Sequence, residues 1–256
     1  MTTSPRRSET YVESLARGLS VLESFSQLGD TASLTEVAQL VGLPKATCRR
    51  LLLTLTELGY LTNIGNEFML TAHVLDLGYA YLSRLPFGDR ATPLLNRLAE
   101  QLHQSCSIAV LEGNDVVYVA RVAVKRLISV QVHVGTRLPA YASALGRVLL
   151  ANLPEAEQET VLKNITMKPL TPHTVKNQLE LRESLDKIHS QGYALVSQEI
   201  ELGLSSVAVP LRNPRTGKVV AALNCSGGAD LEASGFLQQK ALPLLLAAAA
   251  EFESLL

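Results

Sequence analysis

The side chains best suited to chemistry with a partner lie in one short basic segment, residues 45–50. Arginine can hydrogen-bond both O6 and N7 of guanine, threonine can contact a thymine methyl group, and lysine suits a phosphate. No acidic residue occurs between Leu43 and Thr56. The candidate DNA-reading residues are Lys45, Ala46, Thr47, Arg49 and Arg50. The alternative is that these charges form the solvated face of an ordinary surface helix.

Two helices joined by a tight turn are predicted around this segment. Ser33 stands three residues before Glu36, which is capping-box spacing and predicts a short helix over residues 34–41. Gly42 ends that helix, and Pro44 suits the first turn of the next. The inward stripe of this second helix is expected to be Cys48, Leu51, Leu55 and Leu58.

A further helix and a hairpin complete the pattern. Before the pair, Val12, Leu15, Leu19, Leu22 and Phe25 recur at helical steps and share one helical face. After it, residues 60–63 and 67–70 alternate like strands around a turn at 64–66. This order predicts a winged helix-turn-helix at residues 11–72, whose second helix enters the major groove. Candidate contacts to the DNA backbone are Arg17, Thr35 and the wing tip at Asn63 and Asn66.

Composition limits the other classes of function. The chain has 256 residues and a formal net charge of −1, so bulk positive charge cannot attract a polyanion. The longest apolar run, 241–250, is too short to span a bilayer, and the polar residues 1–10 contain no secretory signal, so we expect a cytoplasmic protein without a membrane partner. Cys48, Cys106 and Cys225 show no paired spacing, which predicts reduced thiols and neither a metal nor another cofactor.

Helices and strands alternate in the rest of the chain, which predicts an α/β (α+β) domain. Strands are expected at 105–112, 116–121, 127–134, 193–200, 205–212 and 218–225. Helices are expected at 73–84, 91–102, 155–163 and 176–191. Another is expected to follow the small residues at 138–146 and to end at 152, and a last one begins at about 235. The expected domains are a flexible arm (1–10), a DNA-binding domain (11–72), a linker helix (73–86) and a ligand-binding domain (87–256).

Small side chains at residues 141–146 precede a predicted helix whose first amides could receive a carboxylate. The candidate ligand-binding residues here are Tyr141, Ser143, Ala144 and Leu145. A well-packed strand-to-helix turn would need small residues as well. Arg121, Arg137 and His133 could add positive charge for an acidic ligand, although each type is more often a surface residue. Cys225 could line the site or be a buried core thiol.

The sequence offers little for two other classes of protein, an enzyme and a scaffold. No nucleophile elbow, P-loop, dinucleotide fingerprint or zinc-protease motif occurs, and the five histidines stand singly. These absences speak against catalysis, so a small-molecule-binding enzyme or hydrolase with an accessory helix-turn-helix domain is only the alternative function, and no catalytic residue is assigned. A scaffold that only pairs its helices with partners would leave the basic segment without a role.

Several separate blocks resemble the IclR-type transcriptional regulators in the same order. The N-terminal blocks are RGLSVL at 17–22, LTEVA at 34–38, GLPKATCRRLL at 42–52 and LGY at 58–60. The C-terminal blocks are ASALGR at 142–147, GYA at 192–194, Glu199, GLSSVAVP at 203–210 and GKVVAALN at 217–224. The resemblance covers nearly the whole chain.

This resemblance implies a winged helix-turn-helix followed by a GAF-like effector domain with a mostly antiparallel sheet flanked by helices. It also implies a homodimer or homotetramer that binds partly palindromic double-stranded operator DNA and a small organic acid, with RNA polymerase as a further candidate partner. Ligand can alter DNA binding only through different affinities for two arrangements of the linked domains.

The resemblance also implies positions that contact the effector. They are the amides near Ala144 and Leu145, together with Val196, Ser206, Asn224 and Ser226 on later strands. Val196 and Ser206 stand where regulators of small 2-oxo acids carry an acidic residue and cysteine, which speaks against glyoxylate or pyruvate. The segments VGTRLPAY at 134–141 and QEIELGL at 198–204 look more like the branch that controls aromatic-acid catabolism by the β-ketoadipate route. An aromatic or dicarboxylic acid is therefore expected.

Overall fold

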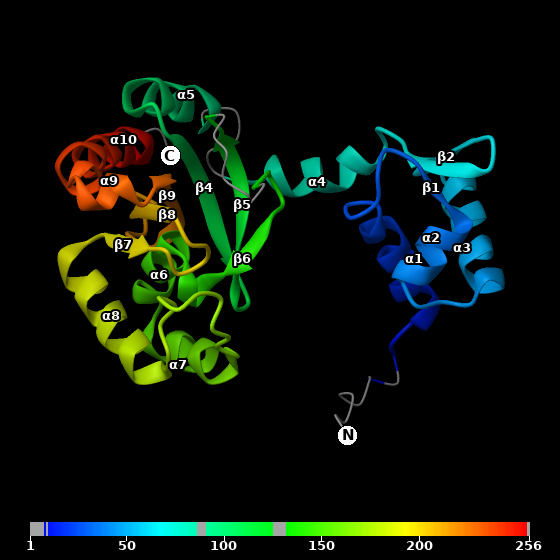
Figure 1. Cartoon of the computed structure of the whole chain (residues 1–256), viewed down its shortest axis with the longest axis horizontal. Coiled ribbons are helices and arrows are strands. Elements are labelled where there is room, and N and C mark those ends of the chain that lie inside the picture. The colour runs from blue at the N-terminus through cyan, green and yellow to red at the C-terminus, as the bar shows by residue number, and fades with distance from the viewer. Residues whose placement is uncertain (1–7, 9, 86–90, 125–131, 255–256) are drawn as a thin grey trace. The chain divides into compact units, whose positions relative to one another are not determined.

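The chain folds into two units, residues 1–84 and 85–256, which are described separately. The structure is a computed structural model that describes residues 8, 10–85, 91–124 and 132–254 (Figure 1). The expected arm at residues 1–10 lies almost wholly outside the described residues.

The N-terminal unit is a helical bundle with a small antiparallel sheet. Its helices are α1 (Glu13–Ser24), α2 (Leu34–Leu40), α3 (Lys45–Glu57) and α4 (Val74–Leu82). Its strands are β1 (Ala32–Ser33), β2 (Leu61–Ile64) and β3 (Glu67–Leu70), in the order β1-β3-β2. This arrangement confirms the predicted winged helix-turn-helix, with β2 and β3 as the wing.

Local signals determine how α2 and α3 begin and end. The Ser33 hydroxyl accepts a hydrogen bond from the Glu36 amide, and the Glu36 carboxylate accepts one from the Ser33 amide, so the predicted capping box is confirmed. Gly42 adopts φ +66°, a left-handed conformation that glycine enters without steric cost. Pro44 is the N-cap residue of α3 rather than a residue of its first turn.

The buried face of α3 differs from the predicted stripe. Cys48, Leu52 and Leu55 are its buried residues, and they pack against Val21 and Phe25 of the α1 region. Leu58 is exposed because it is the C-cap residue beyond the last helical turn, so its place in the stripe was wrong.

One apolar face of α1 is left uncovered. Leu15 is 63% exposed, and Val12 and Leu19 are also exposed, whereas Val21 and Phe25 are buried. The α4 helix has no buried residue, and its Leu75 is 72% exposed. Within the described residues, both helices therefore present large apolar side chains to solvent.

The C-terminal unit is built on one six-stranded sheet in which all neighbours are antiparallel. Its order is β6-β5-β4-β9-β8-β7. The strands are β4 (Ser105–Glu112), β5 (Asp115–Val122), β6 (Arg137–Pro139), β7 (Ala194–Ser197), β8 (Leu204–Arg212) and β9 (Val219–Gly228). The mostly antiparallel sheet of the expected effector domain is confirmed.

Helices cover both faces of this sheet (Figure 1). One face packs on α6 (Ala144–Ala151) and, through α6, on α8 (Gln178–Gln191), with α7 (Glu155–Asn164) in the same layer. The other face packs on α5 (Ala91–Leu102) and α10 (Leu242–Glu253). The short helices are η2 (Ala140–Ala142), α9 (Asp230–Ala233) and η3 (Leu237–Ala241).

The strands before α6 differ from the sequence prediction. The expected strand at 127–134 falls mostly on residues outside the described ranges, and residues 132–134 are not in a strand. A strand that was not predicted, β6, lies at Arg137–Pro139 and pairs with the start of β5. Three residues are too few to show a period of two, so only the pairing partner makes this segment a strand.

Candidate functional site

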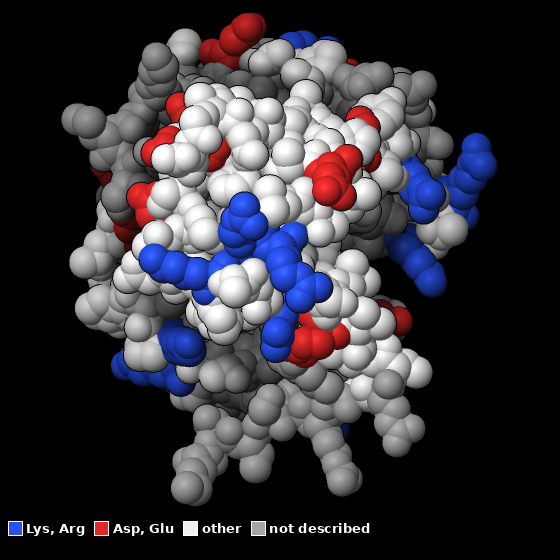
Figure 2. All heavy atoms as spheres, turned by 90° about the vertical axis from the view of Figure 1, so that its right-hand side faces the viewer, with Lys and Arg blue, Asp and Glu red and all other residues white. Residues whose placement is uncertain are grey.

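The exposed surface of α3 carries the candidate DNA-reading residues. Lys45, Ala46, Arg49 and Arg50 are exposed and Thr47 is partly exposed, while Cys48 on the opposite side is buried in the core. No ion pair found among the described residues includes Lys45, Arg49 or Arg50. Figure 2 shows Lys and Arg side chains gathered near the middle of this face, with carboxylates around them. The cationic groups of α3 are therefore available to an anionic partner.

The start of α3 adds unpaired backbone donors to this surface. Pro44 provides no side-chain cap, and Cys48 is the first residue of the turn whose amide bonds back to a carbonyl, that of Pro44. The amides of Lys45, Ala46 and Thr47 thus have no acceptor among the described residues and could donate to one such as a phosphate oxygen.

The other candidate DNA contacts are less uniform. Thr35 is exposed in the first turn of α2. Arg17 is partly neutralised, because its Nε atom lies 3.1 Å from a carboxylate oxygen of Glu13 one turn earlier. Asn63 lies within β2 opposite Phe68, two residues before the Gly65-Asn66 turn that forms the tip of the wing, so its predicted place at the tip was wrong.

In the C-terminal unit, a cluster of polar side chains lies on the sheet face that packs on α6. Residues opposite one another in a ladder share a face. Ser107 of β4 lies opposite both Asn224 of β9 and Arg121 of β5, and Asn224 lies opposite Ala208 of β8. Ala208 belongs to the core that α6 and α8 cover. Asn224, Ser107 and Arg121 therefore all point to the α6 side.

Arg121 is a cation without a described anion. Its Nη1 atom donates a 3.0 Å hydrogen bond to the Ser107 hydroxyl, but its buried Nε–H has no partner among the described residues. Burial lowers the pKa of Arg121 from its ordinary value. The nearby Tyr118 does not neutralise it, because burial raises the pKa of Tyr118 to about 12 despite the opposing effect of Arg121.

Asn224 has a buried hydrogen-bond acceptor without a donor among the described residues. Its Nδ2 atom donates to the Ser206 hydroxyl at 2.9 Å, and Ser206 in turn donates to the Cys225 carbonyl at 3.2 Å. This chain of donors fixes the direction of the Asn224 amide. Its Oδ1 atom is buried and accepts no hydrogen bond from a described residue. Ser226 lies opposite Ser206 on the same face.

The small residues before α6 have a packing role as well as the predicted binding role. A Cβ atom on Gly146 would lie 2.2 Å from the carbonyl oxygen of Ala140, so only glycine allows α6 to pack on η2. The Ser143 hydroxyl caps α6 by accepting from the Gly146 amide. The amides of Ala144 and Leu145 have no acceptor among the described residues. The Tyr141 hydroxyl is already bound to the backbone of Lys168.

Three sequence candidates do not belong to this polar cluster. Cys225 is wholly buried on the opposite face, beside Cys106, because side chains alternate along a strand, so this predicted effector contact does not share a face with Asn224 and Ser226. Its hydrogen bond with Cys106 and burial raise the pKa of the Cys106 thiol. Arg137 is exposed and paired with Glu112 and Asp115. The exposed His133 bonds to Thr136.

A buried ion pair ties the start of α6 to distant segments. Arg147 Nη2 and Glu199 Oε2 are 2.5 Å apart, with side chains only 7% and 12% exposed. Arg147 also donates to the Tyr141 carbonyl and to Ser184 of α8. Glu199 accepts from the Val175 amide. The network thus joins α6, α8, the segment before α8 and the segment after β7.

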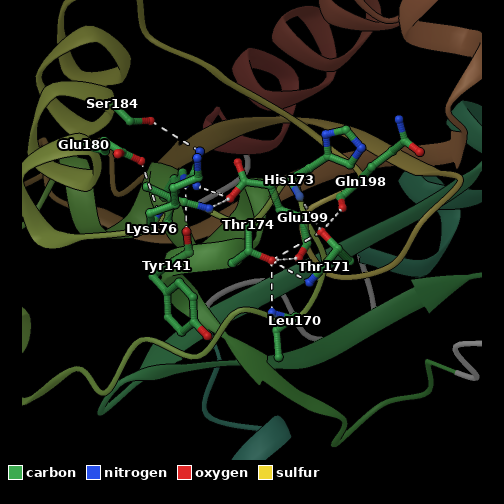
Figure 3. Close-up of polar contacts among 12 residues, drawn as sticks. Tyr141, Leu170, Thr171, His173, Thr174, Lys176, Glu180, Ser184, Gln198 and Glu199 are labelled. Carbon is green, nitrogen blue, oxygen red and sulfur yellow. Dashed lines mark hydrogen bonds and ion pairs between the residues drawn. The ribbon is translucent and has the colours of Figure 1, made fainter.

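The segment before α8 is held to the same residues by threonine hydroxyls. Thr171 donates to the Gln198 carbonyl at 2.6 Å and Thr174 donates to the Glu199 carbonyl at 2.7 Å. In Figure 3, dashed contacts converge on Thr171, Thr174 and Glu199. These bonds restrain the loop between β7 and β8, which leads into Ser206.

No role is predicted for Ser107 from the sequence, and Arg121 is predicted there either as a cation for an acidic ligand or as a surface residue. Arg121 is the single charge in the otherwise apolar run 116–122, and Ser105 and Ser107 alternate with buried residues of β4. That alternation could have indicated that polar residues share one face of the sheet. Only the pairing of β4 with β5 and β9 determines which face that is and which residues lie opposite.

Other kinds of site find no support in the structure. In the described part of the chain, no helix has both the length and the apolar character needed to cross a membrane. The described His, Cys, Asp and Glu residues form no group of three or more that could hold a metal ion.

Two family models and several known regulators match the chain. Residues 14–65 match the IclR helix-turn-helix domain, and residues 79–252 match the family described as bacterial transcriptional regulator IclR C-terminal. The chain is 40% identical to the Pca regulon regulatory protein of Pseudomonas putida, over 93% of this chain and 82% of the relative. It is 36% identical to the p-hydroxybenzoate hydroxylase transcriptional activator of Acinetobacter baylyi, over 97% and 93%.

A solved structure shares the fold of both units. The IclR homologue of Microbacterium hydrocarbonoxydans, crystallised with 4-hydroxybenzoate, is 26% identical with a TM-score of 0.80, covering 94% of this chain and 98% of that one. The matching family and relatives are regulators, so the enzyme alternative finds no support. The chain belongs to the IclR family of bacterial transcriptional regulators, which bind operator DNA through a helix-turn-helix and small effectors through a C-terminal domain.

Proposed function

We propose that residues 11–72 bind a partly palindromic operator, that residues 87–256 bind an aromatic or dicarboxylic acid, and that residues 73–86 join the two domains. The unpaired cationic surface of α3 carries the DNA-binding part of this proposal, because Lys45, Arg49 and Arg50 meet no described carboxylate. Residues 1–72 carry no net positive charge, so affinity depends on where these cations lie.

Arg49 and Arg50 are proposed to hydrogen-bond to bases, and Lys45 to contact a phosphate. Thr47 and Ala46 are proposed to contact the base edges in the major groove. Arg17, Thr35 and Asn63 are proposed as outer contacts to the backbone. We expect two half-sites about 34 Å apart, or a multiple of that distance, for a homodimer or homotetramer. Large exposed apolar residues on α1 and α4, such as Leu15 and Leu75, support self-association. Such a regulator would act in the cytoplasm, with RNA polymerase as the partner that responds to it.

Fluorescence anisotropy of the purified protein tests DNA binding. The probes are a duplex from the region upstream of its own gene and a scrambled duplex, across a salt series. We expect tight, selective binding to the first, with Arg49→Ala or Arg50→Ala costing about 1 to 3 kcal/mol and relaxing the base preference. Lys45→Ala should weaken both duplexes evenly.

The matched control is Arg84→Ala, which removes the same charge from the N-terminal unit but outside α3. Equal binding of the protein to both duplexes would contradict the proposal. Loss of affinity in the control as large as in the α3 variants would show that net charge, and not the α3 surface, drives binding.

The effector part of the proposal rests on the start of α6 and on the polar residues of the sheet that face this helix. The proposed contacts are Tyr141, Ser143, Ala144, Leu145, Ser206, Asn224 and Ser226. Support comes from the open amides at the start of α6 and from the names of the relatives, one of which is an activator for p-hydroxybenzoate hydroxylase. Ser206→Ala should weaken the response of operator binding to added acid while leaving acid-free DNA binding intact. Loss of acid-free DNA binding in this variant would indicate misfolding instead.

A further inference from the structure

Two buried polar atoms on the α6 face of the sheet lack the partners that their chemistry demands. The Arg121 Nε–H is a charged donor without an acceptor, and Asn224 Oδ1 is an acceptor without a donor, among the described residues. Leaving a buried polar group unpaired costs free energy, and more so when the group is charged. The pair therefore marks a place where a ligand can supply what the protein omits.

The two residues with unpaired atoms, Arg121 and Asn224, lie in one row across the sheet. Ser107 stands between them in the ladder, opposite Arg121 on one side and Asn224 on the other. Adjacent strands lie about 4.8 Å apart, so two spacings place the Cα atoms of Arg121 and Asn224 about 10 Å from each other. Arg121 leans toward the middle of this gap, because its guanidinium bonds to Ser107.

The residues around this row are apolar. Tyr118, Ala109 and Ala222 lie on the same face and belong to the core that α6 covers. Such surroundings favour a ring over a hydrated chain and strengthen a charged hydrogen bond within them.

We propose that Arg121 and Asn224 are the two poles of the effector site, and that the effector is a rigid aromatic acid bearing both a carboxylate and a hydroxyl group. The carboxylate accepts from Arg121 and Ser107, and the hydroxyl donates to Asn224 Oδ1. A two-carbon acid is too short to meet both poles. This inference rests on the proposed effector-binding function and names the ligand chemistry of that same site.

Calorimetric titration of the full-length protein without DNA tests the inference. The ligands are 4-hydroxybenzoate and 3-hydroxybenzoate, benzoate as the analogue without a hydroxyl group, and 4-hydroxybenzamide as the analogue without charge. We expect at least one hydroxybenzoate to bind and both analogues to bind at least about tenfold more weakly. Benzoate leaves Asn224 Oδ1 unpaired, and 4-hydroxybenzamide offers Arg121 an acceptor without the negative charge.

Variants should erase one preference at a time. Asn224→Leu should bind benzoate as well as it binds the hydroxybenzoate, and Arg121→Met should bind 4-hydroxybenzamide as well as the acid. Arg121→Lys, which keeps the charge but not the planar fork, should retain a weakened preference for the acid. The matched control is Arg137→Met, since Arg137 is exposed and already paired with two carboxylates. It should bind like the parent protein.

Several results would overturn the inference. One is no binding of either hydroxybenzoate by the parent protein, and another is equal binding of hydroxybenzoate and benzoate. A third is a folded Asn224→Leu or Arg121→Met variant that keeps the discrimination of the parent. If a variant does not fold, the ligand series on the parent decides. Selective operator binding that responds to a dicarboxylic acid but to neither hydroxybenzoate would overturn this inference alone, whereas the expected ligand pattern without operator binding would overturn the proposed DNA-binding function alone.

Discussion

Replacing Glu199 with methionine would leave Arg147 buried without its counterion. The pair is nearly excluded from water, and Glu199 also accepts from the Val175 amide. Removing one partner of a buried ion pair costs about 3 to 5 kcal/mol, because the remaining charge is desolvated and unpaired. Arg147 keeps its hydrogen bonds to the Tyr141 carbonyl and to Ser184, so we expect the lower end, about 3 kcal/mol.

Differential scanning calorimetry gives the test. For a unit of this size, about 3 kcal/mol lowers the midpoint of thermal unfolding by about 6 to 12 °C. The matched control is Glu159→Met, which breaks a pair of the same type with Arg182 whose side chains are 38% and 36% exposed, far more than those of Glu199 and Arg147. Exposed pairs contribute about 0 to 1 kcal/mol, so this variant should stay close to the parent.

A double variant separates charge burial from lost packing. Arg147→Met combined with Glu199→Met removes both charges, and it should be more stable than Glu199→Met alone because no unpaired charge remains. The reasoning fails if Glu199→Met costs no more than Glu159→Met, or if the double variant is the least stable of the three.

Further outcomes can be measured on the C-terminal unit and its helices. Gly146→Ala should cost at least about 1 to 3 kcal/mol in chemical denaturation, because its Cβ atom would overlap the Ala140 backbone, whereas Gly78→Ala in α4 meets no atom within 4 Å and should not destabilise the protein. Because the pKa of Tyr118 is raised to about 12, the folded state keeps a proton that the unfolded chain releases near pH 10. Stability should therefore fall by up to about 3 kcal/mol as the pH rises from 10 to 12. Tyr118→Phe should lack this part of the fall in urea denaturation, and an unchanged fall would show that another group causes it.

Several features of the fold followed from the sequence because they depend on residues close together in the chain. The capping box of Ser33 and Glu36, the turn at Gly42 and the hairpin at 61–70 are set by hydrogen bonds and backbone preferences within a few residues. The basic surface of α3 could be predicted for the same reason, since helical periodicity alone separates the buried face of a helix from its exposed face.

Other features depended on contacts that no local pattern contains. The apolar face at Leu15 has helical spacing, yet it is exposed, because the rest of the unit packs on Val21 and Phe25 instead. β6 is a strand only because β5 lies beside it. Arg147 and Glu199 are 52 positions apart, and the chain between them must fold before they meet.

The distinction between Arg121 and Arg137 shows where sequence reasoning ends. By residue type and spacing, both arginines were equal candidates for a carboxylate. The register places Arg121 on the α6 face beside Ser107, without a described anion, and leaves Arg137 exposed against two carboxylates. The sequence determined the family, the winged helix-turn-helix and effector-domain folds, and the exposed basic surface of α3. Which polar groups share a face and lack partners was decided by the pairing of strands distant in the chain, because only long-range pairing sets what lies opposite each side chain.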